Sequence, residues 1–195
     1  RAGPAPGTIQ PAADRSKPAA AGIGERRRLS RLDSAIRRLQ AQRACLDWAI
    51  GEIAGQPGPV LELGLGNGRT YDHLRHRLPG REIFVFERKV AAHPDCVPDA
   101  GHLFLGDFND TLPGALARIG AGAVFAHCDI GSGDTALTAA LAAFVGPALA
   151  PLLAPGAVVA ADQALEIPGC GGVALPDDVA MGRYYLYRNG LDQTA

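Results

Sequence analysis

The chain has 195 residues, of which 47% are hydrophobic and 20% charged, and its formal net charge is -1. This length is sufficient for one domain with a buried core, and the near-neutral charge argues against a protein that mainly coats nucleic acid. Three prolines divide the longest apolar stretch, residues 135–161, so we expect no membrane span.

The four cysteines are far apart in the sequence and form no CxxC pair; they are Cys45, Cys96, Cys128 and Cys170. Scattered thiols of this kind are typical of reduced proteins and fit neither a disulfide framework nor a zinc site. We therefore predict a cytoplasmic protein.

Residues 1–28 are rich in Ala, Pro and Gly and end in three arginines. This composition buries too little apolar surface to offset the entropy of ordering, so we predict a disordered tail with a basic cluster. The cluster continues in Arg31, Arg37 and Arg38, which we interpret as a solvated helix face, with a patch for an anionic partner as the alternative. Residues 29–195 are predicted to form a single domain with its core in residues 58–190.

A helix is predicted over residues 30–54. Ser30 and Asp33 form a plausible capping box at its start, and Gly55 can end it with a left-handed residue. An apolar stripe at helical spacing is expected to pack on the domain, and it comprises Leu32, Ile36, Leu39, Leu46, Ile50 and Ile53.

The apolar period then changes, and short strand-like runs alternate with helical segments. The predicted strands are residues 59–63, 82–87, 102–106, 123–129, 157–162 and 182–189, and the predicted helices are residues 70–78, 111–119 and 134–153. Such alternation is typical of an α/β protein in which helices cover both faces of a parallel, doubly wound sheet.

A glycine-rich turn follows the first predicted strand. Ligands of parallel sheets bind beyond the carboxyl ends of the strands, and glycines let the backbone approach them closely. The spacing is GxGxG, preceded by an acid, whereas the dinucleotide fingerprint is GxGxxG. An acid would disfavour a pyrophosphate but suits a ligand with an ammonium or sulfonium group, such as S-adenosyl-L-methionine. The predicted cofactor-binding residues of this turn are Glu62, Gly64, Leu65, Gly66, Asn67 and Gly68.

Further candidates for the cofactor site follow the next two strands. Glu87 ends the second strand, where a carboxylate can accept hydrogen bonds from both ribose hydroxyls. Asp107 follows the third strand and is placed to accept from an adenine amino group, with Phe108 as an apolar wall. Arg88 and Tyr71, which opens the helix after the glycine turn, complete this set.

These motifs resemble those of the class I S-adenosyl-L-methionine-dependent methyltransferases. The matching pieces are VLELGLGNG at residues 60–68, Glu87, Gly106-Asp107 and residues 153–156. The phrases LELGLGNGRTYDHLR, FLGDFNDTLP, DIGSGD and GRYYLYR are similar to a small bacterial methyltransferase family of undefined substrate. The resemblance covers residues 29–190.

This resemblance implies a Rossmann-like, mostly parallel sheet of seven strands and a methionine moiety near the glycine turn. It also implies that Glu87 holds the ribose and Asp107 the adenine. Such folds usually carry a full helix after the fifth strand, where this sequence has a shorter segment.

Candidate catalytic residues end the fourth and fifth strands. Asp129 can contact the methionine amine or the methyl acceptor, and Asp162 is the second candidate. With Gln163 they resemble the magnesium site of catechol-type O-methyltransferases, an alternative to our prediction of no metal. Methyl transfer depends mainly on alignment, and it needs a base only where the acceptor must lose a proton.

The sequence therefore predicts an S-adenosyl-L-methionine-dependent methyltransferase that acts on a small molecule, with nucleic acid not expected as a partner. The alternatives are an NAD(P)-dependent oxidoreductase and a non-catalytic S-adenosyl-L-methionine-binding subunit. Because the predicted domain is small, the acceptor pocket would be completed by the N-terminal helix, by the segment after the fifth strand, or by a second subunit of a homo-oligomer.

Overall fold

The computed structural model describes residue 3 and residues 29–190. Apart from Gly3, the tail predicted to be disordered lies outside the described residues, as do residues 191–195.

A seven-stranded sheet forms the centre of the molecule, in the order β3-β2-β1-β4-β5-β7-β6. The strands are β1 (Val60–Leu63), β2 (Ile83–Glu87), β3 (Leu103–Leu105), β4 (Ala123–Cys128), β5 (Leu153–Ala161), β6 (Cys170–Val173) and β7 (Tyr185–Asn189). Strands β1 to β5 are parallel to one another, and β7 is antiparallel to both β5 and β6. Strands β2 and β3 lie on one side of β1, and the chain then returns to place β4 and β5 on the other side. This reversal of direction creates a topological switch point at the end of β1.

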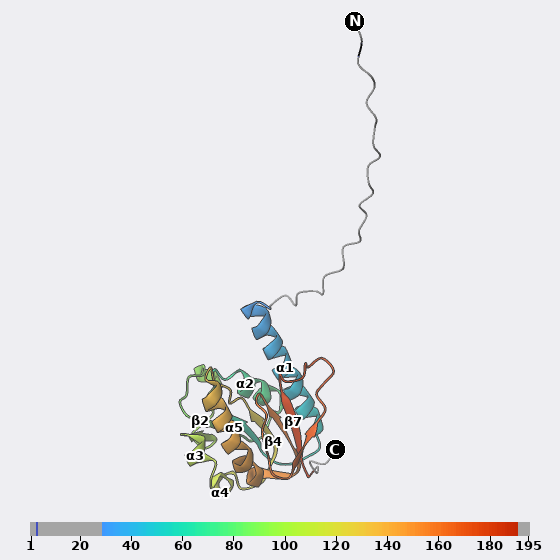
Figure 1. The fold of residues 1–195 in the computed structure, drawn as a ribbon. Helices are drawn as coiled ribbons and strands as arrows, with labels where there is room; N and C mark the ends of the chain where they lie inside the picture. The colour runs from blue at the N-terminus through green and yellow to red at the C-terminus, as the bar shows by residue number, and fades with distance from the viewer. Residues whose placement is uncertain (1–2, 4–28, 191–195) are drawn as a thin grey trace.

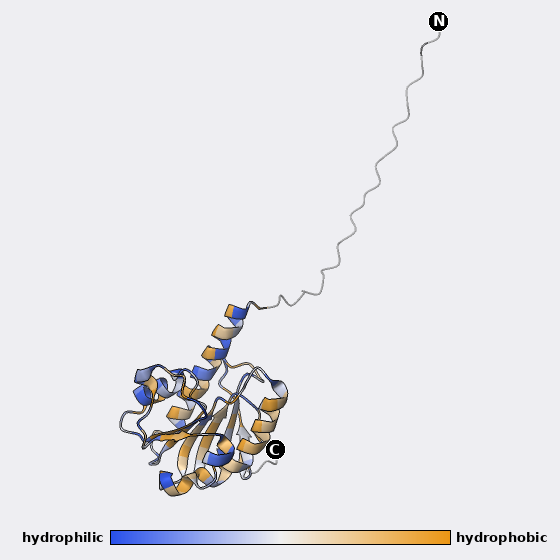
Figure 2. Cartoon of the chain, turned by 90° about the vertical axis from the view of Figure 1, so that its left-hand side faces the viewer, coloured by the Kyte–Doolittle hydropathy of each residue, from blue (hydrophilic) through white to orange (hydrophobic). Residues whose placement is uncertain are grey.

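Helices cover both faces of the sheet (Figure 1). They are α1 (Arg31–Glu52), α2 (Arg69–Arg77), α3 (Phe108–Thr111), α4 (Ala115–Ile119) and α5 (Thr135–Leu149), with short 3-10 turns η1 (Pro94–Cys96) and η2 (Ala150–Leu152). One apolar cluster joins the sheet to α4 and α5, and a second joins it to α1 and α2. The strands between them are mostly hydrophobic (Figure 2), as expected for a sheet buried on two faces.

Helix α1 begins as the sequence predicts but extends beyond the domain. The Ser30 hydroxyl accepts a hydrogen bond from the Asp33 backbone N–H at 3.0 Å. The N-terminal half then projects from the body of the molecule (Figures 1 and 2), and Leu32 and Ile36 are 69% and 44% exposed. The prediction that the whole apolar stripe packs on the domain is therefore wrong for its first half.

Three other local predictions are corrected by the structure. Helix α1 ends at Glu52 with Ile53 as its C-cap, and Gly55 does not have the predicted left-handed conformation. The helix predicted over residues 111–119 is divided into α3 and α4 by a turn in which Gly114 has a φ of +79°. Strand β6 was not predicted at all, and it lies on the outer side of β7.

The segment after β5 contains no helix, in agreement with the short segment noted in the sequence. Helix α5, in contrast, continues through Pro147, and with η2 it forms an apolar stretch over Thr135–Leu152. Among the described residues this is the one stretch long and apolar enough to cross a membrane. Core helices of soluble proteins often have the same length and composition, so this stretch is weak evidence for a membrane span. Its residues Val145 and Leu149 are buried in the cluster against the sheet.

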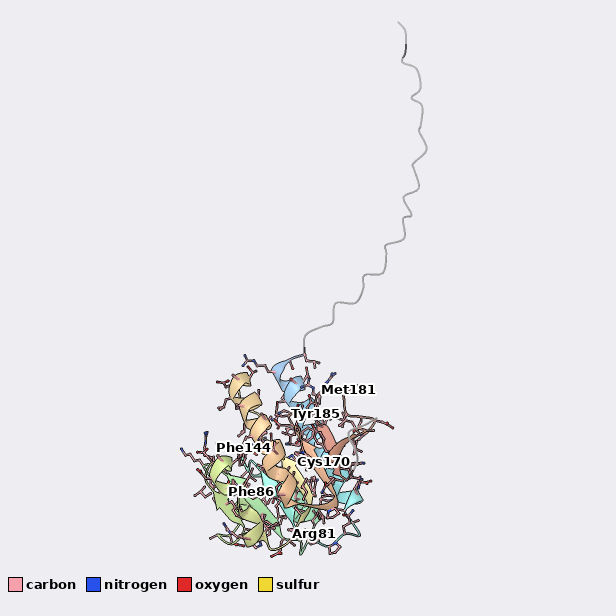
Figure 3. All side chains as sticks on the ribbon, turned by 60° about the horizontal axis from the view of Figure 1, so that its bottom comes forward. Arg81, Phe86, Phe144, Cys170, Met181 and Tyr185 are labelled. Atoms are coloured by element: carbon pink, nitrogen blue, oxygen red, sulfur yellow. The ribbon has the colours of Figure 1, made fainter. Side chains whose placement is uncertain are left out.

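Arg81 ties the end of α1 to the beginning of β1, at the end of the molecule opposite Met181 (Figure 3). Its guanidinium donates to the backbone carbonyls of Gln56 at 2.6 Å and Gly58 at 2.8 Å. Charged donors contribute more to stability than neutral ones, since their hydrogen bonds are stronger.

We expect Arg81→Met to lower the free energy of unfolding by about 1.5–3 kcal/mol in urea denaturation. The control is Arg75→Met, which removes an exposed ion pair with Asp72 and should cost less than about 1 kcal/mol. Equal losses in the two variants would contradict the role assigned to Arg81.

Candidate active site

The glycine turn between β1 and α2 rests directly on the end of β4. Gly64 has a φ of +92°, and a Cβ at this position would clash with the carbonyl oxygen of Asp129. Gly66 has a φ of +51°, and a Cβ there would meet nothing within 4 Å. Gly64 therefore allows the close approach of two loops, whereas Gly66 faces open space at the carboxyl end of the sheet.

Glu87 contacts the glycine turn, as the prediction of a common site requires. Its Oε2 accepts hydrogen bonds from the backbone N–H groups of Leu65 at 2.8 Å and Gly66 at 3.1 Å. Its Oε1 accepts from the N–H of Lys89 at 2.9 Å. A carboxylate offers about four lone-pair positions, so Glu87 retains the capacity to accept from further donors.

A cavity of about 110 Å³ lies beside this turn at the switch point of the sheet. Its walls come from α1, the glycine turn, the start of α2 and the end of β4, and they comprise Arg38, Leu39, Gln42, Leu65, Gly66, Asn67, Arg69, Thr70 and Asp129. Two arginines and one aspartate thus line the same small space. This combination suits a ligand that carries both a carboxylate and an ammonium group.

Asp129 is half-buried in this wall and is held from α1. Its Oδ2 accepts a hydrogen bond from the side-chain amide of Gln42 at 3.0 Å. The same amide nitrogen lies 3.2 Å from the hydroxyl of Tyr184, to which it donates. Asp129 is therefore the predicted catalytic residue that the structure brings into the cavity.

Asp162, the second predicted catalytic residue, caps the turn that follows β4. Its Oδ1 accepts from the N–H of Ile130, and its Oδ2 accepts from the N–H of Gly131, both at 3.0 Å. The side-chain amide of Gln163 also donates to Oδ2 at 3.0 Å. These contacts favour a role in shaping the turn next to Asp129. Within the described part of the chain, no group of three His, Cys, Asp or Glu side chains is arranged to hold a metal ion.

Glu62 lies beneath the glycine turn and does not line the cavity. It is 0% exposed; its Oε1 accepts from the hydroxyl of Thr70, and its Oε2 lies 2.8 Å from Nδ1 of His127. The other ring nitrogen of His127, Nε2, lies 2.5 Å from the hydroxyl of Tyr184. Direct contact between Glu62 and a ligand, which the sequence suggested, would require these buried contacts to break.

Burial and charge shift the pKa values of this network in different directions. Burial acts to lower the pKa of His127, but the adjacent carboxylate of Glu62, together with those of Asp129 and Asp162, outweighs it, and the pKa is raised. Burial raises the pKa values of Tyr184 and Cys128 well above their usual values. The Tyr184 hydroxyl and the Cys128 thiol are consequently protonated at neutral pH.

The remaining predicted cofactor residues lie at the same edge of the sheet or behind it. Asp107 is exposed at the start of α3, two residues after Leu105, which pairs with Glu87. Phe108 is half-buried against the core, and Arg88 is exposed beside Glu87. Tyr71 is buried in the cluster of α1 and α2, with the guanidinium of Arg75 5.6 Å from its ring centre, and it does not line the cavity.

Several residues of this region were not predicted from the sequence. Arg38, Gln42, Arg69 and Thr70 line the cavity, and His127 and Tyr184 lie beneath it. One available signal was Gln42, a polar residue among the small and apolar residues on the buried side of α1.

Comparison with known proteins identifies the family. Residues 29–189, most of the chain, match the family of S-adenosyl-L-methionine methyltransferases. The chain belongs to this family. It is 45% identical to an S-adenosyl-L-methionine methyl transferase from Silicibacter pomeroyi DSS-3 of known crystal structure; the match covers 84% of this chain and 100% of that one, with a TM-score of 0.78. No curated protein matches the chain.

A second solved structure shares the fold. Magnesium protoporphyrin IX methyltransferase from Synechocystis PCC 6803, solved with bound S-adenosylmethionine, is 14% identical, with a TM-score of 0.50; the match covers 81% of this chain and 82% of that one. The family membership confirms the predicted class, fold and cofactor of this methyltransferase. The same finding argues against both alternatives, the NAD(P)-dependent oxidoreductase and the non-catalytic S-adenosyl-L-methionine-binding subunit.

The two glycines of the turn provide a test of its geometry in the methyltransferase. Gly66→Ala should cost about 1–2 kcal/mol of folding free energy from its left-handed backbone alone. Gly64→Ala should cost more, because its Cβ also meets the Asp129 carbonyl. Urea denaturation measures both losses, and a loss in Gly66→Ala that equals or exceeds that of Gly64→Ala would show the contact to be misassigned.

Proposed function

We propose that the protein binds S-adenosyl-L-methionine with its methionine end in the cavity beside α1 and transfers the methyl group to a small-molecule acceptor. The charge of that cavity supports this proposal, because Arg38, Arg69 and Asp129 all line it. The methionine moiety carries a carboxylate and an ammonium group, which these residues would bind with opposite charges. The open space above Gly66 gives the ligand access to the backbone of the turn.

The ribose would lie on Glu87 and the adenine towards Asp107. Glu87 is already fixed by three backbone N–H groups, so its carboxylate is held in one orientation before a ligand arrives. Pre-organised acceptors lose little conformational entropy on binding, which favours affinity. Asp107 follows the neighbouring strand at the same edge, where an adenine next to the ribose would extend.

Bound S-adenosyl-L-methionine supplies an electrophilic methyl group: the acceptor donates a lone pair to the methyl carbon while the carbon–sulfur bond breaks and its electron pair stays on sulfur. The protein contributes alignment of the reacting atoms and exclusion of water. In this proposal Asp129 binds the ammonium group, and Asp162 acts indirectly by fixing the turn at Ile130 and Gly131. An acceptor that carries a proton would also need a base to receive it.

A small acceptor fits the domain, because residues 29–190 form the sheet and its covering helices without an inserted recognition domain. The proposed cytoplasmic location is supported by the sequence, in which the four cysteines are far apart and form no CxxC pair. The predicted homo-oligomer would find an apolar surface on the projecting half of α1, where Leu32 and Ile36 are exposed.

We expect Glu87→Ala to weaken the binding of S-adenosylhomocysteine by about 1–3 kcal/mol in calorimetry, because charge-assisted hydrogen bonds to the ribose are lost. Glu82→Ala, just before the opposite end of β2, is the matched control and should leave the affinity unchanged. A folded Glu87→Ala protein with wild-type affinity would remove Glu87 from the site.

A second pair of variants tests the methionine end of the site. Arg38→Ala should weaken S-adenosylhomocysteine binding about tenfold or more, because the carboxylate of the ligand would lose its cationic partner. The adjacent Arg37 does not line the cavity, so Arg37→Ala controls for the loss of one positive charge and should bind normally. Equal effects of the two substitutions would indicate a general charge effect and contradict the proposed contact.

A further inference from the structure

A continuous chain of hydrogen bonds leads from the interior of the domain to the cavity. It joins side chains from α2, β1, β4, the residue before β7, α1 and the end of β4, in the order Thr70, Glu62, His127, Tyr184, Gln42 and Asp129. The contacts from Glu62 to Asp129 measure 2.8, 2.5, 3.2 and 3.0 Å in this order. Residues far apart in the sequence are thus linked through a single path that ends on the proposed ligand-binding carboxylate.

The four central side chains of this hydrogen-bond chain are buried. Glu62 and His127 are 0% exposed, Tyr184 is 1% exposed and Gln42 is 5% exposed. Among the described residues, no buried side-chain nitrogen or oxygen lacks a partner. Burying a carboxylate beside an imidazole is costly, and apolar residues of similar volume often give equal or greater stability. Stability alone is therefore a weak reason for this network.

The hydrogen-bond inventory gives each group in the chain one role. Gln42 uses its amide nitrogen towards both Tyr184 and Asp129, which fixes the orientation of that amide. With a neutral imidazole, the Tyr184 hydroxyl donates to Nε2 of His127, and Nδ1–H donates to Glu62. Glu62 in turn fixes the ring of His127, because its carboxylate can only accept.

We propose that Glu62, His127 and Tyr184 are positioning residues that act on the cofactor site through Gln42. Gln42 holds Oδ2 of Asp129, while Oδ1 accepts no hydrogen bond from the rest of residues 29–190. The free oxygen is thereby directed to the ammonium group of the ligand. This inference rests on the proposed binding of the methionine moiety at Asp129.

Tyr184 acts on the ligand only indirectly. Its side chain is buried, and its hydroxyl is already engaged by His127 and Gln42. It does not line the cavity that contains Asp129. Loss of its hydroxyl would leave Gln42 with one partner fewer, and the orientation of the Asp129 carboxylate would become less restricted.

The direct test is Tyr184→Phe, which removes the hydroxyl and keeps the ring. The control is Tyr187→Phe, three residues further along the chain in β7, because the Tyr187 hydroxyl also takes part in a hydrogen bond, which it accepts from the backbone N–H of Leu165 at 2.8 Å. We expect Tyr184→Phe to weaken S-adenosylhomocysteine binding about tenfold in calorimetry and Tyr187→Phe to change it less than about twofold.

A double-mutant cycle with Gln42→Ala separates positioning from a general loss of stability. If Tyr184 acts through Gln42, Tyr184→Phe should have almost no further effect on affinity in the Gln42→Ala protein. Additive effects would overturn the proposal. If Tyr184→Phe does not fold, Gln42→Ala decides alone, and wild-type affinity in that variant would also overturn it.

A readout without ligand distinguishes failure of this inference from failure of the proposed function. The NMR signals of the Gln42 side-chain amide should move in Tyr184→Phe and stay in place in Tyr187→Phe. If they do so while the wild-type protein fails to bind S-adenosylhomocysteine, the positioning chain stands and the proposed ligand is wrong. Unmoved Gln42 signals in a folded Tyr184→Phe protein would overturn the positioning chain itself.

Discussion

Glu62 places a carboxylate inside a strand whose other residues are all apolar and buried, and the neighbouring elements must accommodate that charge. A buried carboxylate needs close donors, which Thr70 and His127 provide. The imidazole then needs a partner on its second nitrogen, and Tyr184 supplies it. These requirements connect α2, β1, β4 and the residue before β7 below the glycine turn, where the polar side chains are hydrogen-bonded and buried.

The sequence predicted those parts of the fold that follow from local pattern. Strands β1, β2 and β4 are nearly continuous apolar runs, as strands covered on both faces must be, and they were recognised on that basis. Strand β6 contains Gly171 and Gly172, which have little preference for strands, and its pairing with β7 depends on tertiary contacts. The spacing of apolar residues in α1 correctly predicted a helix. Such spacing does not show whether another part of the protein packs against each apolar side chain, and Leu32 is exposed.

The same distinction separates the predicted from the missed residues of the site. Gly64, Glu87 and Asp129 belong to turns at the ends of parallel strands, and topology alone brings them to one edge. Arg38 and Gln42 reach the cavity only because α1 crosses that edge, which depends on packing of its C-terminal half. Glu62 was expected beside the ligand, but the alternation of side chains along β1 turns it towards α1 and α2, where His127 meets it.

A crystal structure of the protein with S-adenosylhomocysteine bound would show whether Asp129 binds the ammonium group of the ligand. We expect that group within about 3 Å of Oδ1 of Asp129, with Gln42 still donating to Oδ2 and the ligand carboxylate beside Arg38. A ligand whose amino-acid end lies outside the cavity, or an Asp129 side chain turned away from it, would contradict the account.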